Sequence, residues 1–399
     1  MDKYIFFDNA STTKCCPAAL ECVRRFACDE YANPSSSHKP GREAARAISK
    51  AREFFADHFN VEPKQVIFTA SGSESDNLAI YGSALGDKSD ARQTITVLTT
   101  TTEHPAVRKT AASLAKFGVN HITVPVSSGS IDETALMQCC DVNKNLVCSI
   151  HQVNNITGAL YDVETLAGKV KSRAKGRAVF HTDAVQAFGK IRSPSWPSAV
   201  DMLSISSHKL HGPKGIGALI VLNSRILEQG LRPLVWGGGQ EGGWRSGTQS
   251  PGLVAGFHAA ALEAIQNMQS RTATFQKLRE QLFFNLEATG TLRHLRTNSP
   301  DTAVPYIINL SAPGIPAGPF ARMIEEHGVI VATGSACESG KVSSDPVLDA
   351  MGLEPAISSS AIRISFSHLN TAGEIDRLSD AIKQSLETLS SSLPGRRQR

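Results

Sequence analysis

The chain has 399 residues, of which 41% are hydrophobic and 20% charged, a composition typical of a globular protein with a sizeable core. Its 41 basic and 37 acidic side chains leave a formal net charge of +4, which gives no reason to expect a nucleic-acid partner. No apolar run is long enough for a membrane-spanning helix, and the first residues lack a secretion signal, so we expect a cytoplasmic protein with no membrane partner.

Short β-rich runs alternate with helical patterns between about residue 65 and residue 222. One expected helix begins at Pro105, and another places Val163, Leu166 and Val170 on one face. The runs that we expect to form strands are 66–69, 94–98, 146–150, 178–182, 202–206 and 217–222. This alternation predicts an α/β fold with a mainly parallel sheet sandwiched by helices.

The pattern changes after about residue 265. A long helical stretch precedes strand-like residues 306–310, a helical pattern through Phe320 and Ile324, and strand-like residues 361–366. We interpret this part as a smaller α+β domain. The predicted division is a large domain of residues 16–264 and a small domain of residues 1–15 and 265–399.

Lys209 follows an expected strand, stands between His208 and His211, and precedes the glycine-rich residues 212–217. An aldehyde cofactor needs a lysine amine, held in a pocket and part of the time uncharged, to form a Schiff base. Two alternatives are a plain surface lysine and a loop for nucleotide phosphates. The stretch does not match the P-loop pattern, and it leads into a strand instead of a helix.

A second polar motif, residues 69–77, follows the strand at 66–69 and begins a helix. Gly72 would let the backbone approach an anion, and Ser73 with the free amides of the first turn could bind phosphate. The alternative is a serine that only caps the helix.

Three further segments carry candidate site residues, and the first two follow expected strands. Asp183 could pair with a protonated ring nitrogen of a cofactor, or it could cap a helix. His104 could stack on an aromatic cofactor, or it could be structural. The glycine-dense residues 237–248 indicate either close approach of the backbone to a ligand or flexibility.

The eight cysteines lie at positions 15, 16, 22, 28, 139, 140, 148 and 337. We expect reduced thiols and no zinc site, because the chain has neither a secretion signal nor a CxxC pair. Cys148 lies in an apolar run and is expected in the core. Cys337 is flanked by glycine, serine and alanine, which suits an exposed loop.

Together these motifs resemble the fold-type I enzymes that use pyridoxal 5′-phosphate (PLP). More narrowly, the chain resembles the cysteine desulfurases of the class V aminotransferase family. The resemblance covers nearly the whole chain, and its motifs lie at residues 7–13, 33–38, 72–77, 102–104, 153–155, 183–186, 207–209, 245–248, 334–337 and 360–363. It implies PLP as the cofactor and L-cysteine as the substrate.

The resemblance also implies a role for each matching residue. Lys209 would hold the cofactor and move protons, and His104 would stack on its ring. Asp183 would pair with the ring nitrogen, and Gln186 would contact the phenolic oxygen. The phosphate would be held by Gly72, Ser73, Ser206, His208 and, from the partner subunit, Thr248. Asn155 and Arg363 would hold the substrate carboxylate. A site completed across a subunit boundary implies a homodimer.

Cys337 carries the implied reaction. In the long-loop group of the family, the matching thiolate takes sulfur from L-cysteine, which leaves a persulfide and L-alanine. The sulfur would pass to an acceptor protein, such as a scaffold for iron–sulfur clusters or a carrier in tRNA thiolation. We expect no resident metal, although Cys337 could transiently ligate an iron–sulfur cluster.

Some positions depart from the family pattern, and other functions stay open. Ser207, Gly242, Ser367 and Asn370 stand where other residues are common. One alternative is a PLP lyase or aminotransferase acting on selenocysteine or another small amino acid. Another is a binding protein that uses the glycine loops for nucleotide phosphates.

Overall fold

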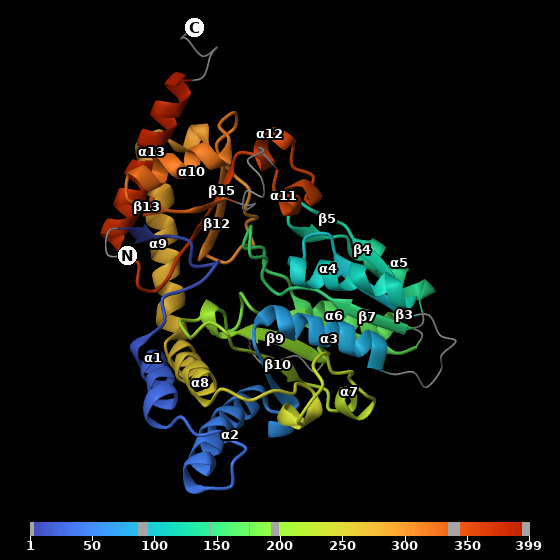
Figure 1. The fold of residues 1–399 in the computed structure, drawn as a ribbon. Coiled ribbons are helices and arrows are strands. Elements are labelled where there is room, and N and C mark those ends of the chain that lie inside the picture. The colour runs from blue at the N-terminus through green and yellow to red at the C-terminus, as the bar shows by residue number, and fades with distance from the viewer. Residues whose placement is uncertain are drawn as a thin grey trace.

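A seven-stranded sheet lies at the centre of the larger part of the molecule (Figure 1). The computed structural model describes residues 4–86, 95–143, 145–174, 176–192, 199–333 and 344–392. In sheet order the strands are β2 (Val66–Thr69), β10 (Gly217–Val221), β9 (Met202–Ser206), β8 (Ala178–Asp183), β7 (Asn145–Ser149), β3 (Ile95–Thr100) and β4 (Asn120–Val124). Only β10 runs antiparallel to its neighbours within this sheet. The prediction of a mainly parallel sheet sandwiched by helices is therefore confirmed.

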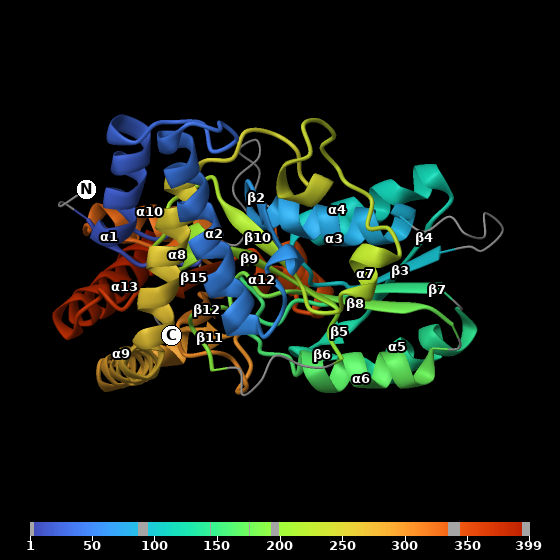
Figure 2. The ribbon, with the colours of Figure 1, turned by 90° about the horizontal axis from the view of Figure 1, so that it is seen from below.

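Helices cover both faces of this sheet, as Figure 2 shows. The helices α3 (Gly72–Gly86) and α4 (Pro105–Ser113) lie on one face, and α5 (Glu133–Val142) and α6 (Val163–Arg173) lie on the other. Successive strand side chains point to opposite faces. Val97 accordingly packs with the α3 and α4 side chains, and Leu98 packs with those of α5 and α6. Buried strands of this kind need apolar residues at every position.

A group of helices packs beside the sheet, formed by α1 (Pro17–Arg24), α2 (Lys39–Phe59) and α8 (Pro251–Gln266). Phe55 of α2 lies fully buried at its centre. Its ring centroid lies 4.8 Å from that of Phe257 on α8, 6.0 Å from that of Phe68 and 6.2 Å from that of Phe188. These aromatic contacts tie the helices to the strand and turn that carry site residues.

A second, antiparallel sheet forms the core of the C-terminal part. Its order is β11 (Arg296–Thr297), β12 (Ile307–Ser311), β15 (Ala361–Ser365) and β14 (Ala332–Thr333). The helices α9 (Met268–Ala288), α10 (Ala317–Glu326) and α13 (Ala372–Ser392) pack beside it. The N-terminal strand β1 (Ile5–Phe6) joins this part by pairing in parallel with β13 (Val329–Ile330). The exact division into domains at residues 15 and 264 stays a prediction.

Shorter elements complete the described chain. They are β5 (Val126–Ser127), β6 (Ser130–Ile131), α7 (Arg225–Glu228), α11 (Pro346–Ala350), α12 (Pro355–Ser358), a π-helical turn at Arg25–Asp29 and 3-10 turns at Pro63–Gln65, Leu114–Phe117, Ser207–Lys209, Gln240–Gly243 and Leu292–His294. Among the described residues, no helix is both long and apolar enough to span a membrane. Cys148 is buried on β7, as expected.

Candidate active site

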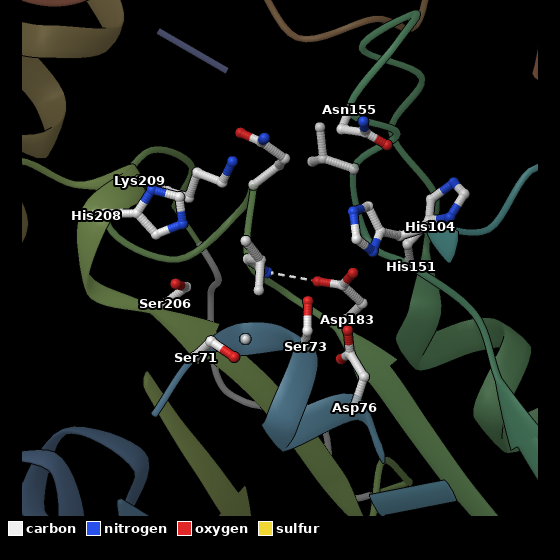
Figure 3. A pocket seen from close by; sticks show the side chains of 14 residues that line it. Ser71, Ser73, Asp76, His104, His151, Asn155, Asp183, Ser206, His208 and Lys209 are labelled. Atoms are coloured by element: carbon white, nitrogen blue, oxygen red, sulfur yellow. Dashed lines mark hydrogen bonds between the residues drawn. The ribbon is translucent and has the colours of Figure 1, made fainter. Parts of the chain in front are cut away.

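A cavity of about 270 Å³ opens at the carboxyl edge of the seven-stranded sheet (Figure 3). Ligands of open α/β sheets bind at this edge, because the loops that follow the parallel strands meet there. The ends of five strands, together with the segments that follow them, supply the lining residues Ser71, Gly72, Ser73, Asp76, His104, His151, Val153, Asn155, Asp183, Val185, Gln186, Ser206, His208 and Lys209. Nine residues expected from the sequence therefore come together, namely Gly72, Ser73, His104, Asn155, Asp183, Gln186, Ser206, His208 and Lys209.

Lys209 lies in a 3-10 turn directly after β9. Its Nζ donates hydrogen bonds to the carbonyl oxygens of Ala10 at 2.7 Å and Ser11 at 2.6 Å. Burial of the amine, together with the charge of Arg363, lowers the pKa of Lys209 to about 8. A useful fraction of the amine is therefore uncharged near neutral pH, as condensation with an aldehyde requires.

One end of the cavity is built for an anion. Gly72 opens α3, and a Cβ at this position would lie 2.7 Å from a methyl carbon of Val185 and 3.2 Å from the Cβ of Ser206. The Ser206 hydroxyl is buried and, within the part of the chain that the structure describes, has no hydrogen-bond partner. A buried hydroxyl without a partner beside the free amides of a helix N-terminus fits a phosphate group.

His208 stands at the same end. Its Nδ1 lies 3.1 Å from the Thr12 hydroxyl. Burial, reinforced by the charge of Lys209, lowers the pKa of His208 to about 4, so the imidazole is neutral at physiological pH. A neutral ring can donate only one hydrogen bond, which suits a phosphate oxygen without adding a charge.

The other end of the cavity carries Asp183 and His104. Oδ1 of Asp183 accepts a hydrogen bond from the backbone N–H of Val185 at 2.9 Å, the dashed line in Figure 3. Nδ1 of His104 accepts from the N–H of Ala106 at 3.1 Å and caps α4. The structural alternative therefore holds in part for His104, whereas Asp183 bonds to a turn after β8 and caps no described helix.

The protonation of these two groups follows from their burial. Burial raises the pKa of Asp183, and the His104 ring opposes this effect. Burial lowers the pKa of His104, which favours the neutral ring. A flat neutral ring can stack on an aromatic ligand. The neighbouring carboxylate can accept a hydrogen bond from a protonated ring nitrogen of that ligand.

Asp76 is a site residue that the sequence reasoning missed. It is 1% exposed, and burial together with the charge of Asp183 raises its pKa well above the usual value. Figure 3 shows Asp76 and Asp183 on the same side of the cavity, with Ser73 nearby. The signal was present, because Asp76 follows Ser73 by three residues and therefore lies on the same face of α3.

A buried pair of Glu103 and His151 was also missed. Nδ1 of His151 lies 2.8 Å from Oε2 of Glu103, and the Thr100 hydroxyl donates to Oε1 of Glu103 at 2.7 Å. Burial disfavours the charged imidazole, but the Glu103 carboxylate prevails and raises the pKa of His151. The two residues follow β3 and β7, which are neighbours in the sheet, and only the strand order reveals that they meet.

Arg363 lies beside the cavity without lining it. From β15 it donates to the Asn155 carbonyl at 2.9 Å, to the Asp8 carboxylate at 2.7 Å and to the Ser11 hydroxyl at 2.7 Å. Thr248 is exposed on the loop after the 3-10 turn at 240–243 and does not line the cavity. Cys337, together with residues 334–343 around it, lies outside the described residues.

Known proteins resemble this chain over nearly its whole length. The family model described as Aminotransferase class-V matches residues 5–378. A cysteine desulfurase of Nostoc sp. is 35% identical over 388 residues, which cover 96% of this chain and 93% of that relative. A solved structure described as a NifS-like protein is 33% identical, with a TM-score of 0.86, and the match covers 97% of this chain and 100% of the other.

A further solved structure is described as SspA in complex with cysteine. It is 31% identical to this chain with a TM-score of 0.76, and the match covers 92% of this chain and 99% of that one.

Proposed function

Because this chain belongs to the cysteine desulfurases of the class V aminotransferase family, we propose that it removes sulfur from L-cysteine with PLP as its cofactor. The observation that carries the proposal is the position of Lys209. Its amine, with a pKa near 8, lies in one cavity with the anion-binding end at Gly72 and Ser206 and the carboxylate of Asp183. PLP presents a group for each of them, namely an aldehyde for the amine, a phosphate for the anion-binding end and a ring nitrogen for the carboxylate.

The residues of the cavity fit this cofactor. The buried Ser206 hydroxyl would donate a hydrogen bond to the phosphate, which Gly72, Ser73 and His208 would also contact. Asp183 would hold the ring nitrogen in its protonated form, and His104 would cover the ring. When bound, PLP supplies an aldehyde that condenses with amines and a ring that accepts an electron pair from the substrate Cα.

Lys209 and Arg363 would then handle the substrate. Once the substrate amine has displaced it, the Lys209 amine is free to take the proton from the substrate Cα and to return a proton later. The Arg363 guanidinium would bind the substrate carboxylate in two parallel hydrogen bonds, with Asn155 beside it. In this structure Arg363 donates a hydrogen bond to the Asp8 carboxylate, so the substrate carboxylate would have to replace that of Asp8.

We assign the sulfur transfer to Cys337. Its thiolate attacks the substrate sulfur, so that an S–S bond forms and the bond between substrate sulfur and Cβ breaks. The electron pair of the broken bond stays with the substrate carbon skeleton, which takes up a proton and leaves as L-alanine. Cys337 keeps the sulfur as a persulfide and delivers it to an acceptor protein, such as an iron–sulfur scaffold or a tRNA-thiolation carrier.

The test is mass spectrometry of the holoenzyme after incubation with L-cysteine, followed by alkylation. We expect one added sulfur atom on the peptide that contains Cys337. Cys337→Ala should stay yellow and bind cysteine, yet form neither the persulfide nor alanine. The matched control is Cys28→Ala, which removes an exposed thiol that does not line the described cavity and should keep full activity. Undiminished alanine formation by Cys337→Ala would contradict the proposal.

We also propose that two copies of the chain form the working enzyme. Thr248 supports this, because its side chain is exposed on a loop and does not line the cavity of its own chain. It would bind the phosphate in the partner's site.

The seven cysteines that the structure describes are free thiols, which agrees with the cytoplasmic location that we propose.

A further inference from the structure

Lys190 contacts a residue of the cavity that the cofactor would touch. Its Nζ donates a hydrogen bond of 2.9 Å to Oε1 of Gln186, four residues earlier, and Gln186 lines the cavity. Lys190 itself is not a lining residue. The turn after β8 brings the two together, because Gly189 takes a φ of +72°, which glycine adopts without strain.

A second contact fixes Lys190 from the C-terminal part of the molecule. Its ammonium lies 5.2 Å from the ring centroid of Tyr306, a distance at which a cation is attracted to an aromatic face. The Tyr306 hydroxyl in turn donates to the backbone oxygen of Gln186 at 2.8 Å. Gln186 is thus held at its side chain by Lys190 and at its backbone by Tyr306.

These contacts determine which way the Gln186 amide points. The charged form of Lys190 can only donate hydrogen bonds, so the amide turns its oxygen toward Lys190 whenever the lysine is protonated. The nitrogen then faces away, where it donates to the Ala10 carbonyl at 2.8 Å and keeps its second hydrogen for a ligand. The two orientations of a glutamine amide differ little in shape, and the Ala10 carbonyl and Lys190 favour the same one.

The burial of the Lys190 ammonium at this position is energetically unfavourable. Among the residues that the structure describes, Lys190 makes no ion pair, and its nearest charged neighbours include the cations Lys209 and Arg363. Burial and these two charges lower the pKa of Lys190 to about 7. A lysine with no structural ion pair, beside two other cations, is better explained by the contact that it makes to Gln186 than by stability.

We propose that Lys190 is a positioning residue, which turns the amide nitrogen of Gln186 toward the phenolic oxygen of the bound cofactor; this rests on the function proposed above. A donor at the phenolic oxygen withdraws electron density from it. The oxygen then holds the proton of the neighbouring imine nitrogen less tightly, so the pKa of the imine between Lys209 and the cofactor falls.

The experiment follows this imine pKa by the visible absorbance of the purified holoenzyme as the pH is changed, without substrate. We expect Lys190→Met to raise the imine pKa by about one unit, which is the scale of a single hydrogen bond. Gln186→Ala should raise it by a similar amount. Adding Lys190→Met to Gln186→Ala should then change it by less than about 0.3 units, because the two residues act as one unit.

Controls separate this mechanism from others. Lys169→Met removes an exposed lysine that pairs with Glu133 on the protein surface, and it should leave the imine pKa unchanged. Lys190→Leu, which also lacks a donor, gives the same readout if the methionine variant does not fold. An equal shift by Lys190→Met with and without Gln186 would show a charge acting through space and would overturn the proposal, as would no shift at all.

Failure of this inference can be told apart from failure of the proposed function. If the wild-type protein takes up PLP and shows an imine pKa that does not respond to Lys190, only the positioning role is wrong. If the wild-type protein stays colourless with PLP, the proposed function itself is wrong.

Discussion

Lys209, His208 and His104 show how burial sets the charges of single residues in the cavity. Burial disfavours the positive form of each side chain, so both imidazoles are neutral and the amine is close to half-charged near pH 8. The carboxyl groups respond in the opposite direction, because burial raises the pKa of Asp76 and of Asp183. Burial therefore shifts each of these groups toward its uncharged form.

The pKa of Lys209 leads to a prediction about cofactor uptake. Only the neutral amine attacks an aldehyde, so the neutral fraction, and with it the association rate of PLP with the apoprotein, should rise as the pH increases through about 8 and then level off. Stopped-flow absorbance between pH 6 and 9.5 measures this rate. Lys209→Ala serves as the control and should form no covalent complex. A rate that does not depend on pH in this range would contradict the assignment.

The start of α3 is the element on which the anion-binding end depends. Gly72→Ala would place a Cβ 2.7 Å from a methyl carbon of Val185 and 3.2 Å from Ser206, so one of these side chains must move. Overpacking of this kind costs about 1–3 kcal/mol. The dissociation constant of PLP should therefore rise roughly 10-fold, on the scale of 1.4 kcal/mol per factor of ten. Absorbance titration of the apoprotein measures it.

Gly168 of α6 provides the control for this prediction. A Cβ there would meet no atom within 4 Å, so Gly168→Ala should leave the PLP affinity unchanged and make the helix slightly more stable. Equal PLP affinities for the two variants and the wild-type protein would show that the close approach at Gly72 has no bearing on the cofactor.

The glycine-rich loop at 237–248 is anchored by a buried ion pair. Two oxygens of Glu241 accept hydrogen bonds of 2.8 Å each from Arg52 on α2, and one of them also accepts from the N–H of Phe68 on β2 at 2.9 Å. Glu241 has a φ of +50°, which is strained for a residue with a side chain. The ion pair therefore fixes a loop conformation that the local sequence disfavours.

Arg52→Met should leave the Glu241 carboxylate buried and uncompensated. A change of this kind costs about 3–5 kcal/mol, so the free energy of unfolding in urea should fall by that amount. The control is Arg24→Met, which removes an exposed guanidinium paired with Glu21 and Asp29 and should cost less than about 1 kcal/mol. If both variants lose the same small amount, the loop does not depend on the ion pair.

At the scale of the whole molecule, the exposed Thr248 predicts a site shared by two chains. Thr248→Val should weaken PLP binding in the pure homodimer. In a hybrid dimer with Lys209→Ala, one site combines an intact Lys209 with an intact Thr248 from the other chain. Titration of this hybrid should recover one site of wild-type PLP affinity. An affinity that stays at the level of the Thr248→Val homodimer would show that Thr248 does not act across the subunit boundary.

The sequence by itself determined the elements and the identity of the groups that meet at the cavity. Alternating apolar runs and helical patterns reflect local periodicity and burial, so the strands at β2, β7, β8, β9 and β10 were predictable to within one or two residues. Because the carboxyl ends of parallel strands share an edge, the polar residues after them could be expected in one place. Lys209, Asp183 and His104 were found in this way, whereas Ser206 was expected only from the family resemblance.

Only the tertiary structure decided the contacts between side chains that are distant in the sequence. The pairs of Glu103 with His151, Asp8 with Arg363 and Arg52 with Glu241 each join different elements. Strand order and the depth of burial set such distances, and neither leaves a local pattern in the chain. The same holds for Lys190. From the sequence, a lysine after a glycine is expected at the surface, but the fold places it between Gln186 and Tyr306.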